Sequence, residues 1–308
     1  MTDTTDSVQQ TALAYSRAER DLALLKAHRH VVLRRFMENR LAVAGVIVVL
    51  FFYAVAIAAP VISRYDPDAL NPGERSQPPS AAHWLGTDRN TRDEYARLVV
   101  GSRISLSVGT TAVLIIMTCG TALGAMAGYF GGWVDTLIMR FTDILLSIPQ
   151  ILLLIAAAAL FSQYNALAVT IAVIGLTSWP GTARLVRGQF LSLKDQEFVT
   201  AARTIGATPG QIIRRHLFPN ALAVIIVQAT LWLAYAILLE ASLSYLGLGV
   251  QIPTPSWGNM LQQGQTELLN GAWWLTVFPG LAIFFITLAF NLMGDGLRDA
   301  LDPRLQRR

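Results

Sequence analysis

LAVAGVIVVLFFYAVAIAAPVIS, from Leu41 to Ser63, is a run of 23 residues without a charged side chain. A helix of that length is about 35 Å long, which is enough to cross the hydrocarbon core of a bilayer with some tilt. The 40 residues before the run are polar and contain seven Lys and Arg, a pattern that argues against a cleaved secretory signal. The run therefore predicts an uncleaved first membrane span.

The composition extends this prediction to the whole chain. Of its 308 residues, 53% are hydrophobic and only 14% are charged, and the mean hydropathy is +0.46. Soluble proteins carry about 25% charged residues. Further apolar runs predict spans at about 104–129, 145–161, 167–182, 221–239 and 274–292. The sequence thus predicts an all-α integral membrane protein with six transmembrane helices.

The distribution of basic residues predicts the orientation, because cytoplasmic segments carry the excess of Lys and Arg. With the N-terminus inside, 18 of the 24 Lys and Arg lie on the cytoplasmic side, and the other six share the first outer loop with six acidic residues. We therefore expect cytoplasmic tails at 1–40 and 293–308, an extracytoplasmic loop at 64–103 and a helical core at 104–292. Residues 1–10 are expected to be disordered.

Local spacing predicts two contacts between or along the spans. Gly120, Gly124 and Gly128 form a doubled small-xxx-small pattern, which lets another helix approach closely in lipid. Arg140 and Asp143 have a spacing that permits an ion pair on one helix. We interpret both features as structural.

The polar segment 192–220 between the fourth and fifth predicted spans is expected to form two short helices with a break. Ser192 with Asp195 is expected to cap the first helix, and Gly206 is well placed as its left-handed stop. The start signal of the second helix is an N-cap Thr208, a proline at the first helical position and a capping-box Gln211. Pro219 is expected to end that second helix.

The predicted corner between these two helices has two interpretations. Small residues on its exposed turn, Thr200, Ala201 and Ala202, would allow insertion into a groove of another protein. Alternatively, the segment is an ordinary amphipathic connector on the membrane surface, with Arg214 and Arg215 near lipid headgroups. The residue pattern alone leaves both interpretations open.

The spacing within this segment resembles a known family motif. Thr200-Ala201-Ala202, then Gly206, then His216-Leu217-Phe218-Pro219 are similar to the EAA loop of binding-protein-dependent ABC importer permeases, whose pattern is Glu-Ala-Ala, three residues, Gly, nine residues and Ile-x-Leu-Pro. The chain departs from that pattern at Thr200 and His216. The resemblance implies that the residues coupling this chain to an ATPase are Thr200, Ala201, Ala202, Arg203, Gly206, Ala207, His216 and Pro219.

Further motifs are similar to C-type subunits of dipeptide and oligopeptide permeases. They are Leu85-Gly86-Thr87-Asp88, Arg92-Asp93, Gly101 to Leu106, Gly132-Trp133-Val134-Asp135, Glu240 to Gly249, Pro255-Ser256-Trp257-Gly258 and Gly294 to Pro303. Together the motifs extend from Arg34 to Arg304. The family usually carries a glycine just before the arginine that corresponds to Arg92. This chain has Thr91 at that position instead.

The resemblance implies a type I ABC importer permease fold in a bacterial plasma membrane. It also implies a B-type permease partner, two ABC ATPase subunits that bind ATP and Mg, and an extracytoplasmic peptide-binding protein. Peptides are the implied substrate, and nickel chelates or glutathione are alternatives carried by similar permeases. The chain itself is expected to hold no cofactor, metal or nucleic acid.

Two rival classes remain open from the residues alone, an integral membrane enzyme and a channel. The only lysines are Lys26 and Lys194, and neither lies in a phosphate-binding loop sequence. We therefore expect no catalytic residue and no ATPase activity in this chain. A channel would transport without ATP, so co-purification of an ATPase would distinguish the three classes.

Glu240 stands at the end of an apolar run, where a carboxylate is costly unless it is paired or hydrated. One interpretation places it on the substrate path, where it would receive a peptide amine. The other is structural, with the carboxylate satisfied by backbone amides or by Ser242 or Ser244. Tryptophans near predicted span ends, among them Trp257, are interpreted as interface anchors.

Overall fold

The computed structural model of the chain describes residues 31–70 and 75–301. Within these ranges the protein is helical, and an isolated bridge between Thr87 and Asp93 is its only β-type pairing. The helices are α2 (Arg40–Ile62), α3 (Glu94–Phe130), α4 (Gly132–Ser147), α5 (Gln150–Leu160), α6 (Ala166–Lys194), α7 (Glu197–Thr204), α8 (Pro209–Ile212), the π-helix η1 (Ile213–Leu217), α9 (Phe218–Tyr245), α10 (Trp257–Leu268) and α11 (Trp274–Leu301).

The all-α prediction is confirmed for this part of the chain. Residues 31–38 of the expected N-terminal tail are helical as well. The expected disorder of residues 1–10, and the expectations for the rest of 1–30 and for 302–308, lie outside the described residues.

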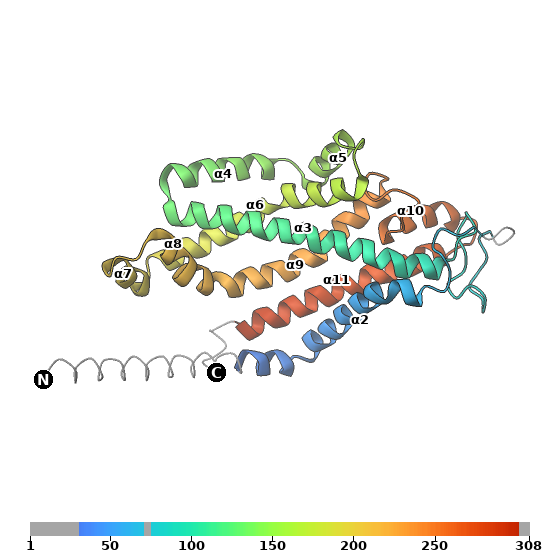
Figure 1. Cartoon of the computed structure of the whole chain (residues 1–308), viewed down its shortest axis with the longest axis horizontal. Coiled ribbons are helices and arrows are strands. Elements are labelled where there is room, and N and C mark those ends of the chain that lie inside the picture. The colour runs from blue at the N-terminus through green and yellow to red at the C-terminus, as the bar shows by residue number, and fades with distance from the viewer. Residues whose placement is uncertain (1–30, 71–74, 302–308) are drawn as a thin grey trace, which may run out of the picture.

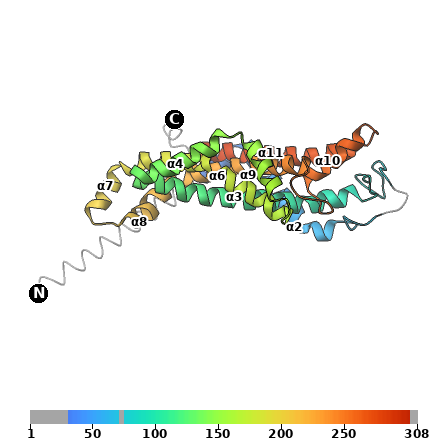
Figure 2. The ribbon, with the colours of Figure 1, turned by 90° about the horizontal axis from the view of Figure 1, so that it is seen from above.

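The long helices lie side by side along one axis, and the shorter ones gather at its two ends (Figure 1). α7 and α8 lie at one end, and the last turns of α11 point toward that end. α10 and the loop between α2 and α3 lie at the opposite end. The view from above shows that the bundle is a flattened slab (Figure 2).

Five helices of the described chain are long and apolar enough to cross a membrane: α2, α3, α6, the continuous helix from Pro209 to Tyr245, and α11. The pair α4 and α5 gives a sixth span if the two helices are counted together. The large apolar side chains on the outside of α2, such as Ile57 and Val61, are exposed. Exposed apolar surface of this extent is expected where helices face lipid or another subunit.

The third predicted span, 145–161, is wrong as a single straight helix. The structure has α4 and α5 instead, bent by 90° at a short break. The break falls at Ile148 and Pro149, and Ile148 is extended, with φ −94° and ψ 130°. A residue before proline is driven out of the helical region by contact with the proline ring, which explains the bend.

Three spans are longer than their apolar runs. α3 begins at Glu94 rather than at Ile104, because Asp93 caps it by accepting a hydrogen bond from the Ala96 amide at 2.7 Å. α6 continues to Lys194 and α11 to Leu301. Helix ends depend on caps and on what the last turns contact, whereas hydropathy marks only the part that lies in lipid.

The predicted close packing at the three glycines is found between α3 and α6. A Cβ on Gly120 would lie 2.6 Å from the Cβ of Thr182, and one on Gly128 would lie 2.7 Å from the Cβ of Phe190. Gly124 faces Val186 in the same way, at 2.9 Å. The absence of side chains on this face of α3 lets α6 approach along two helical turns, as small residues do in membranes.

Candidate functional site

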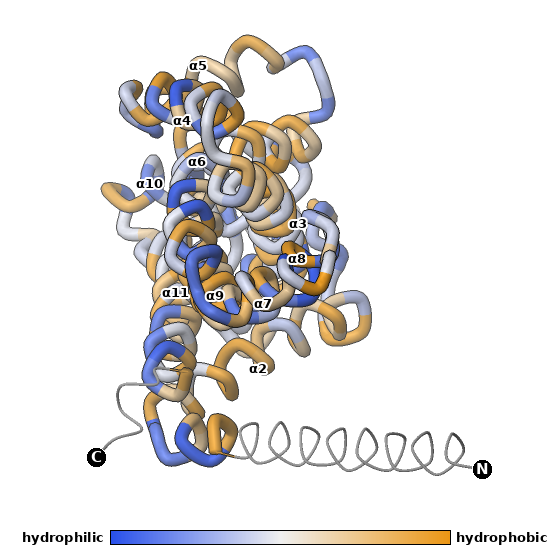
Figure 3. Tube along the Cα trace, turned by 90° about the vertical axis from the view of Figure 1, so that its left-hand side faces the viewer, coloured by the Kyte–Doolittle hydropathy of each residue, from blue (hydrophilic) through white to orange (hydrophobic). Residues whose placement is uncertain are grey.

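The segment between α6 and α9 turns through two short helices, and we call Glu197–Ile212 the α7–α8 elbow. It lies at the end of the bundle shown in Figure 3, where hydrophilic and apolar segments alternate along the chain. The predicted break between two helices is present. The predicted first cap is wrong, because Ser192 is still inside α6 and α7 begins after Gln196, whose side chain makes no capping bond.

α7 ends in a Schellman motif centred on Gly206. Gly206 has φ +84°, as the sequence predicted for a left-handed stop. Its amide donates to the Arg203 carbonyl at 3.0 Å, and the next amide, that of Ala207, donates to the Ala202 carbonyl at 3.0 Å. These two bonds satisfy carbonyls that a helix end would otherwise leave unpaired. A Cβ on Gly206 would touch nothing, so the glycine is required for its backbone conformation.

α8 begins at the predicted capping box. The Thr208 amide donates to Gln211 Oε1 at 2.9 Å, and the Gln211 amide donates to Thr208 Oγ1 at 3.4 Å, with Pro209 as the first helical residue. Ala207 is the one residue between the stop of α7 and the cap of α8. The angle between the two helices is therefore set by hydrogen bonds on both sides of a single residue.

The prediction that Pro219 ends the second helix is wrong. The chain continues from α8 through η1 into α9, and Pro219 sits in the first turn of α9. In η1 the Phe218 amide donates to the Ile213 carbonyl, and the Asn220 side chain donates to the His216 carbonyl at 2.7 Å. The wider π-helical turn accommodates the proline, so the helix passes through it.

The elbow has a buried face and an exposed face. Ala202 is buried with Val199 and Ile212 in an apolar cluster that also contains Phe190 of α6 and Leu217 of η1. This cluster holds the elbow against the ends of α6 and α9. Ala202, one of the implied coupling residues, therefore acts in packing and is not part of the exposed surface.

Thr200, Ala201, Arg203 and Gly206 form the exposed face of the elbow. Ile205 at its tip is 85% exposed. Ile205 is not among the residues implied by the family motif, although an isoleucine next to a predicted left-handed stop is a recognisable signal. An exposed isoleucine beside small residues is a surface suited to an apolar pocket in a partner.

His216 lies in η1 and is partly buried. Its ring centroid lies 6.3 Å from that of Phe198 in α7. The contact joins the two halves of the motif, so His216 supports the elbow rather than forming its exposed tip.

Glu240 lies in α9, and the residue is 0% exposed. Ser105 Oγ of α3 donates to its Oε2 at 2.9 Å, and Ser244 Oγ donates to its Oε1 at 2.8 Å. Ser242, the other serine considered, donates to the Leu238 carbonyl instead. The geometry favours the structural interpretation of Glu240.

The hydrogen bonds of Glu240 extend into α10, a helix that the sequence analysis did not predict. The Trp257 amide donates to Ser105 Oγ at 3.1 Å, and the Trp257 indole donates to the Leu98 carbonyl at 3.1 Å. Trp257 is buried in the core beside α3, so its interpretation as an interface anchor is wrong. α9, α3 and α10 meet at this one buried polar site.

The predicted ion pair between Arg140 and Asp143 is not formed. Asp143 of α4 pairs with Arg184 of α6, and Asp135 of α4 pairs with Arg187 of α6. Both pairs join residues distant in sequence, which is why spacing along one helix did not find them. They attach α4 to the half of α6 that leads into the elbow.

Charged side chains of the outer loop and of the first turn of α3 are buried beside a glutamine of α10. We call Asp88, Arg92, Glu94, Arg97 and Gln263 the outer charge cluster. Arg92 Nε donates to Asp88 Oδ2 at 2.7 Å, and Arg92 Nη2 donates to Gln263 Oε1 of α10 at 2.7 Å. The cluster therefore joins the loop, the start of α3 and α10. The sequence motifs contained Asp88 and Arg92 but gave no sign of the partner in α10.

Thr91 stands where the resemblance led us to expect a glycine, and its φ is +66°. The turn is closed by the Thr91 amide, which donates to the Asp88 carbonyl at 3.0 Å. A β-branched residue rarely adopts this conformation, because its Cβ crowds the backbone. The backbone thus keeps the turn that a glycine would adopt without strain.

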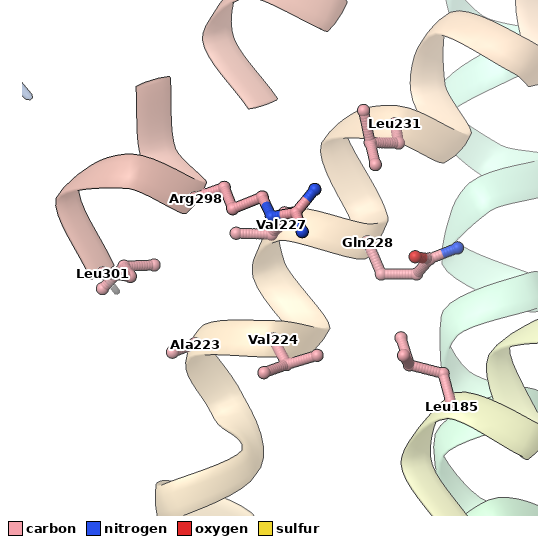
Figure 4. Close-up of a pocket in the computed structure, with 8 residues that line it drawn as sticks. All are labelled: Leu185, Ala223, Val224, Val227, Gln228, Leu231, Arg298 and Leu301. Atoms are coloured by element: carbon pink, nitrogen blue, oxygen red, sulfur yellow. The ribbon is translucent and has the colours of Figure 1, made fainter. Parts of the chain in front are cut away.

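A cavity of about 450 Å³ lies between α6, α9 and α11. Apolar side chains form most of its wall, and Arg298 of α11 and Gln228 of α9 are its polar members, as the close-up shows (Figure 4). The lining residues are Leu185, Ala223, Val224, Val227, Gln228, Leu231, Arg298 and Leu301. The cavity lies in the half of the bundle nearer the elbow.

Comparison with known families identifies the class. Residues 120–307 match the family described as "Binding-protein-dependent transport system inner membrane component". Residues 29–79 match the "N-terminal TM domain of oligopeptide transport permease C". The helical bundle with its elbow is therefore a transport permease of the inner membrane, and the chain belongs to the family of binding-protein-dependent transport system inner membrane components.

Similar proteins include the dipeptide transport system permease protein DppC of Alkalihalophilus pseudofirmus, 46% identical over 89% of this chain and 89% of the relative. DppC of Bacillus subtilis is 43% identical over 89% of this chain and 85% of the relative. The glutathione transport system permease protein GsiD of Pectobacterium atrosepticum is 43% identical over 89% of this chain and 90% of the relative.

A solved structure has the same fold. A chain of the inward-facing MetNI methionine ABC transporter superposes with a TM-score of 0.51 at 21% identity, covering 67% of this chain and 96% of that one. The fold is that of an ABC importer permease. The relatives named above are transport permeases, which favours a transport role over the integral membrane enzyme considered from the residues alone.

Proposed function

We propose that this chain is the C-type permease subunit of an ATP-driven peptide importer, forming half of the translocation path beside a B-type permease subunit. Relatives named as dipeptide and oligopeptide permeases, at 41–46% identity, support the peptide substrate. The match to the N-terminal domain of permease C supports the C-type assignment.

The observation that carries the proposal is the α7–α8 elbow. Hydrogen bonds on both sides of Ala207 fix its angle, and the buried cluster around Ala202 attaches it to α6 and α9. Its exposed face combines the small residues Thr200, Ala201 and Gly206 with Arg203 and the exposed Ile205. In our proposal two ABC ATPase subunits, which bind ATP and Mg, receive this face and move it during their cycle. This chain binds neither ATP nor Mg and has no catalytic residue.

The proposed topology places both termini and the elbow in the cytoplasm. The excess of Lys and Arg on that side supports this orientation, and so does the arrangement of the bundle, since the elbow and the end of α11 lie toward the same end (Figure 1). An extracytoplasmic peptide-binding protein would then meet the opposite end, with the outer loop and α10. The membrane is the bacterial plasma membrane.

Glutathione, a tripeptide, is a second candidate substrate, because GsiD proteins are 43–44% identical to this chain over about nine-tenths of its length. Nickel chelates are the remaining alternative implied by the resemblance. Measuring the ligands of the binding protein that works with this permease would separate the three. Uptake of a labelled dipeptide that excess glutathione does not reduce would support the peptide assignment.

Co-purification tests the role of the elbow. Ile205→Asp places a charge on its exposed tip without touching the buried cluster, so we expect loss of the co-purifying ATPase and of uptake, with an unchanged melting temperature. Leu269→Asp is the matched control, because Leu269 is 95% exposed and follows α10 at the opposite end. It should retain the ATPase. If Ile205→Asp retains both ATPase and uptake, the proposed docking surface is wrong.

A further inference from the structure

A very small cavity lies inside the outer charge cluster. It has a volume of about 10 Å³ and is lined by residues from the outer loop, α3, α10 and the start of α11, including Glu94, Arg97 and Met260. This volume is at the lower limit of what one water molecule needs, and it is too small for any larger ligand.

Two buried polar atoms belong to the residues that line this cavity. Glu94 is 2% exposed and Arg97 is 1% exposed. Glu94 Oε1 and Arg97 Nη2 have no hydrogen-bond partner within the described part of the chain. The other nitrogens of Arg97 are engaged, since Nη1 lies 3.3 Å from the Pro67 carbonyl and Nε lies 3.8 Å from Asp88 Oδ2.

Buried polar groups of native proteins nearly always have a partner, and those of charged side chains are the most costly to leave unpaired. The donor Arg97 Nη2 and the acceptor Glu94 Oε1 are complementary. A water molecule can accept from the first and donate to the second, and two further lining residues, Asp88 and Gln263, offer additional polar atoms. Two to four polar partners are what a buried water requires.

We propose that this cavity is a binding site for one ordered water molecule, held between Arg97 Nη2 and Glu94 Oε1. The water completes the hydrogen bonds of Glu94 and Arg97 in the first turn of α3, within a cluster whose direct contacts already link α3, the preceding loop and α10. This inference is independent of the transported substrate and of the ATPase.

Met260 provides a reporter of the water. Met260 lines the cavity and is 2% exposed, so bulk solvent does not reach it. X-ray radiolysis splits a bound water into a hydroxyl radical and a hydrogen atom. The radical adds to the sulfur of the adjacent methionine, and dissolved oxygen then takes up one electron and one proton to leave the sulfoxide. In the full-length protein, purified in lipid nanodiscs with the subunits that accompany it, we expect Met260 to be oxidised at a rate approaching that of Met37, which lies before the first span and is 60% exposed.

Two variants test the partner atoms. Glu94→Gln retains an oxygen acceptor and should retain the oxidation of Met260, whereas Glu94→Leu removes the acceptor and should lower it severalfold. Phe290, which is buried away from the cavity, is the control for general opening of the fold and should stay unmodified in every sample. An unoxidised Met260 in the wild-type protein would overturn the proposal, as would equal oxidation in Glu94→Leu with Phe290 still protected.

A density map gives a second measurement that does not depend on a variant folding. At a resolution that shows ordered water, we expect a separate peak within hydrogen-bond distance of both Glu94 Oε1 and Arg97 Nη2. A direct contact between these two atoms, with no peak between them, would refute the site.

Discussion

Asp135 of α4 and Arg187 of α6 form a two-pronged ion pair. Arg187 Nε donates to Asp135 Oδ1, and Arg187 Nη2 donates to Oδ2 at 2.6 Å. Both side chains are partly shielded from solvent, and a planar guanidinium that meets both carboxylate oxygens holds its partner in a defined orientation. α4 is thereby attached to the part of α6 that leads into the α7–α8 elbow.

Removing this ion pair should loosen α4. We expect Asp135→Asn to lower the stability of the purified protein by about 1 kcal/mol, because the pair is partly exposed and partly screened by solvent. Thermal unfolding in detergent measures the effect. Asp143→Asn removes the more exposed pair with Arg184 and serves as the control. An effect of Asp143→Asn equal to or larger than that of Asp135→Asn would contradict the assigned importance of the two-pronged pair.

The two alanines of the elbow should respond differently to enlargement. Ala202→Leu should destabilise the elbow by about 1–3 kcal/mol, because the buried cluster has no room for the larger side chain. Ala201→Leu adds the same atoms on the exposed face and should leave stability unchanged while weakening ATPase co-purification. Protease sensitivity of the segment between α6 and α9 is the measurement. Equal sensitivity of the two variants would show that the buried and exposed faces are wrongly assigned.

Replacing Thr91 should relieve a strained turn. Thr91→Gly is expected to stabilise the protein by up to about 1 kcal/mol, because the cost of a positive φ at a β-branched residue exceeds the entropy that glycine loses on folding. Asn90→Gly next to it brings only the entropic cost and should destabilise by about 0.5–1 kcal/mol. Denaturation midpoints of the two variants should therefore move in opposite directions, and a shift in the same direction would argue against strain at Thr91.

Substitutions at glycine should separate close packing from helix propensity. Gly124→Ala places a methyl group against Val186 and should cost about 1–3 kcal/mol. Gly188→Ala in α6 meets no atom within 4 Å and should be neutral or slightly stabilising, since alanine favours a helix more than glycine does. The yield of folded protein after extraction is the measurement, and an intact yield for Gly124→Ala would contradict the close contact of α3 and α6.

The role of Glu240 can be read from substrate selectivity. Glu240→Gln keeps oxygen and nitrogen atoms near Ser105 and Ser244, so a structural role predicts equal changes in the uptake of peptides with free and with blocked amino ends. Uptake of both peptide types in the same cells measures this. Selective loss of the free-amine peptide would place Glu240 on the substrate path after all.

Sequence reasoning succeeded where the chemistry is local. The stop at Gly206 and the cap at Thr208 depend on residues within five positions of each other, and both are found as expected. The spacing of three glycines likewise predicted a packed helix face. Membrane spans were located by hydropathy, because length and apolarity together define a segment that crosses lipid.

Prediction from the sequence failed where contacts between residues distant in the chain determine the structure. Ser105 and Glu240 are 135 positions apart, and the amphipathic α10 between Glu240 and the last span has no hydropathy signal of its own. Asp143 pairs with Arg184 of α6 and not with Arg140, the arginine three residues before it. Pro219 failed to stop a helix because the preceding turn widened, which no propensity scale describes.

The unbroken helix from Pro209 to Tyr245 contains 37 residues, which corresponds to a rod of about 55 Å. Because the helix is long, a small rotation moves its far end a considerable distance. A rotation of about 5° about one end displaces the other end by about 5 Å. Glu240 lies near the far tip of this helix, where two serines donate hydrogen bonds to it. A small rotation of the elbow would therefore displace this site by about the width of a side chain.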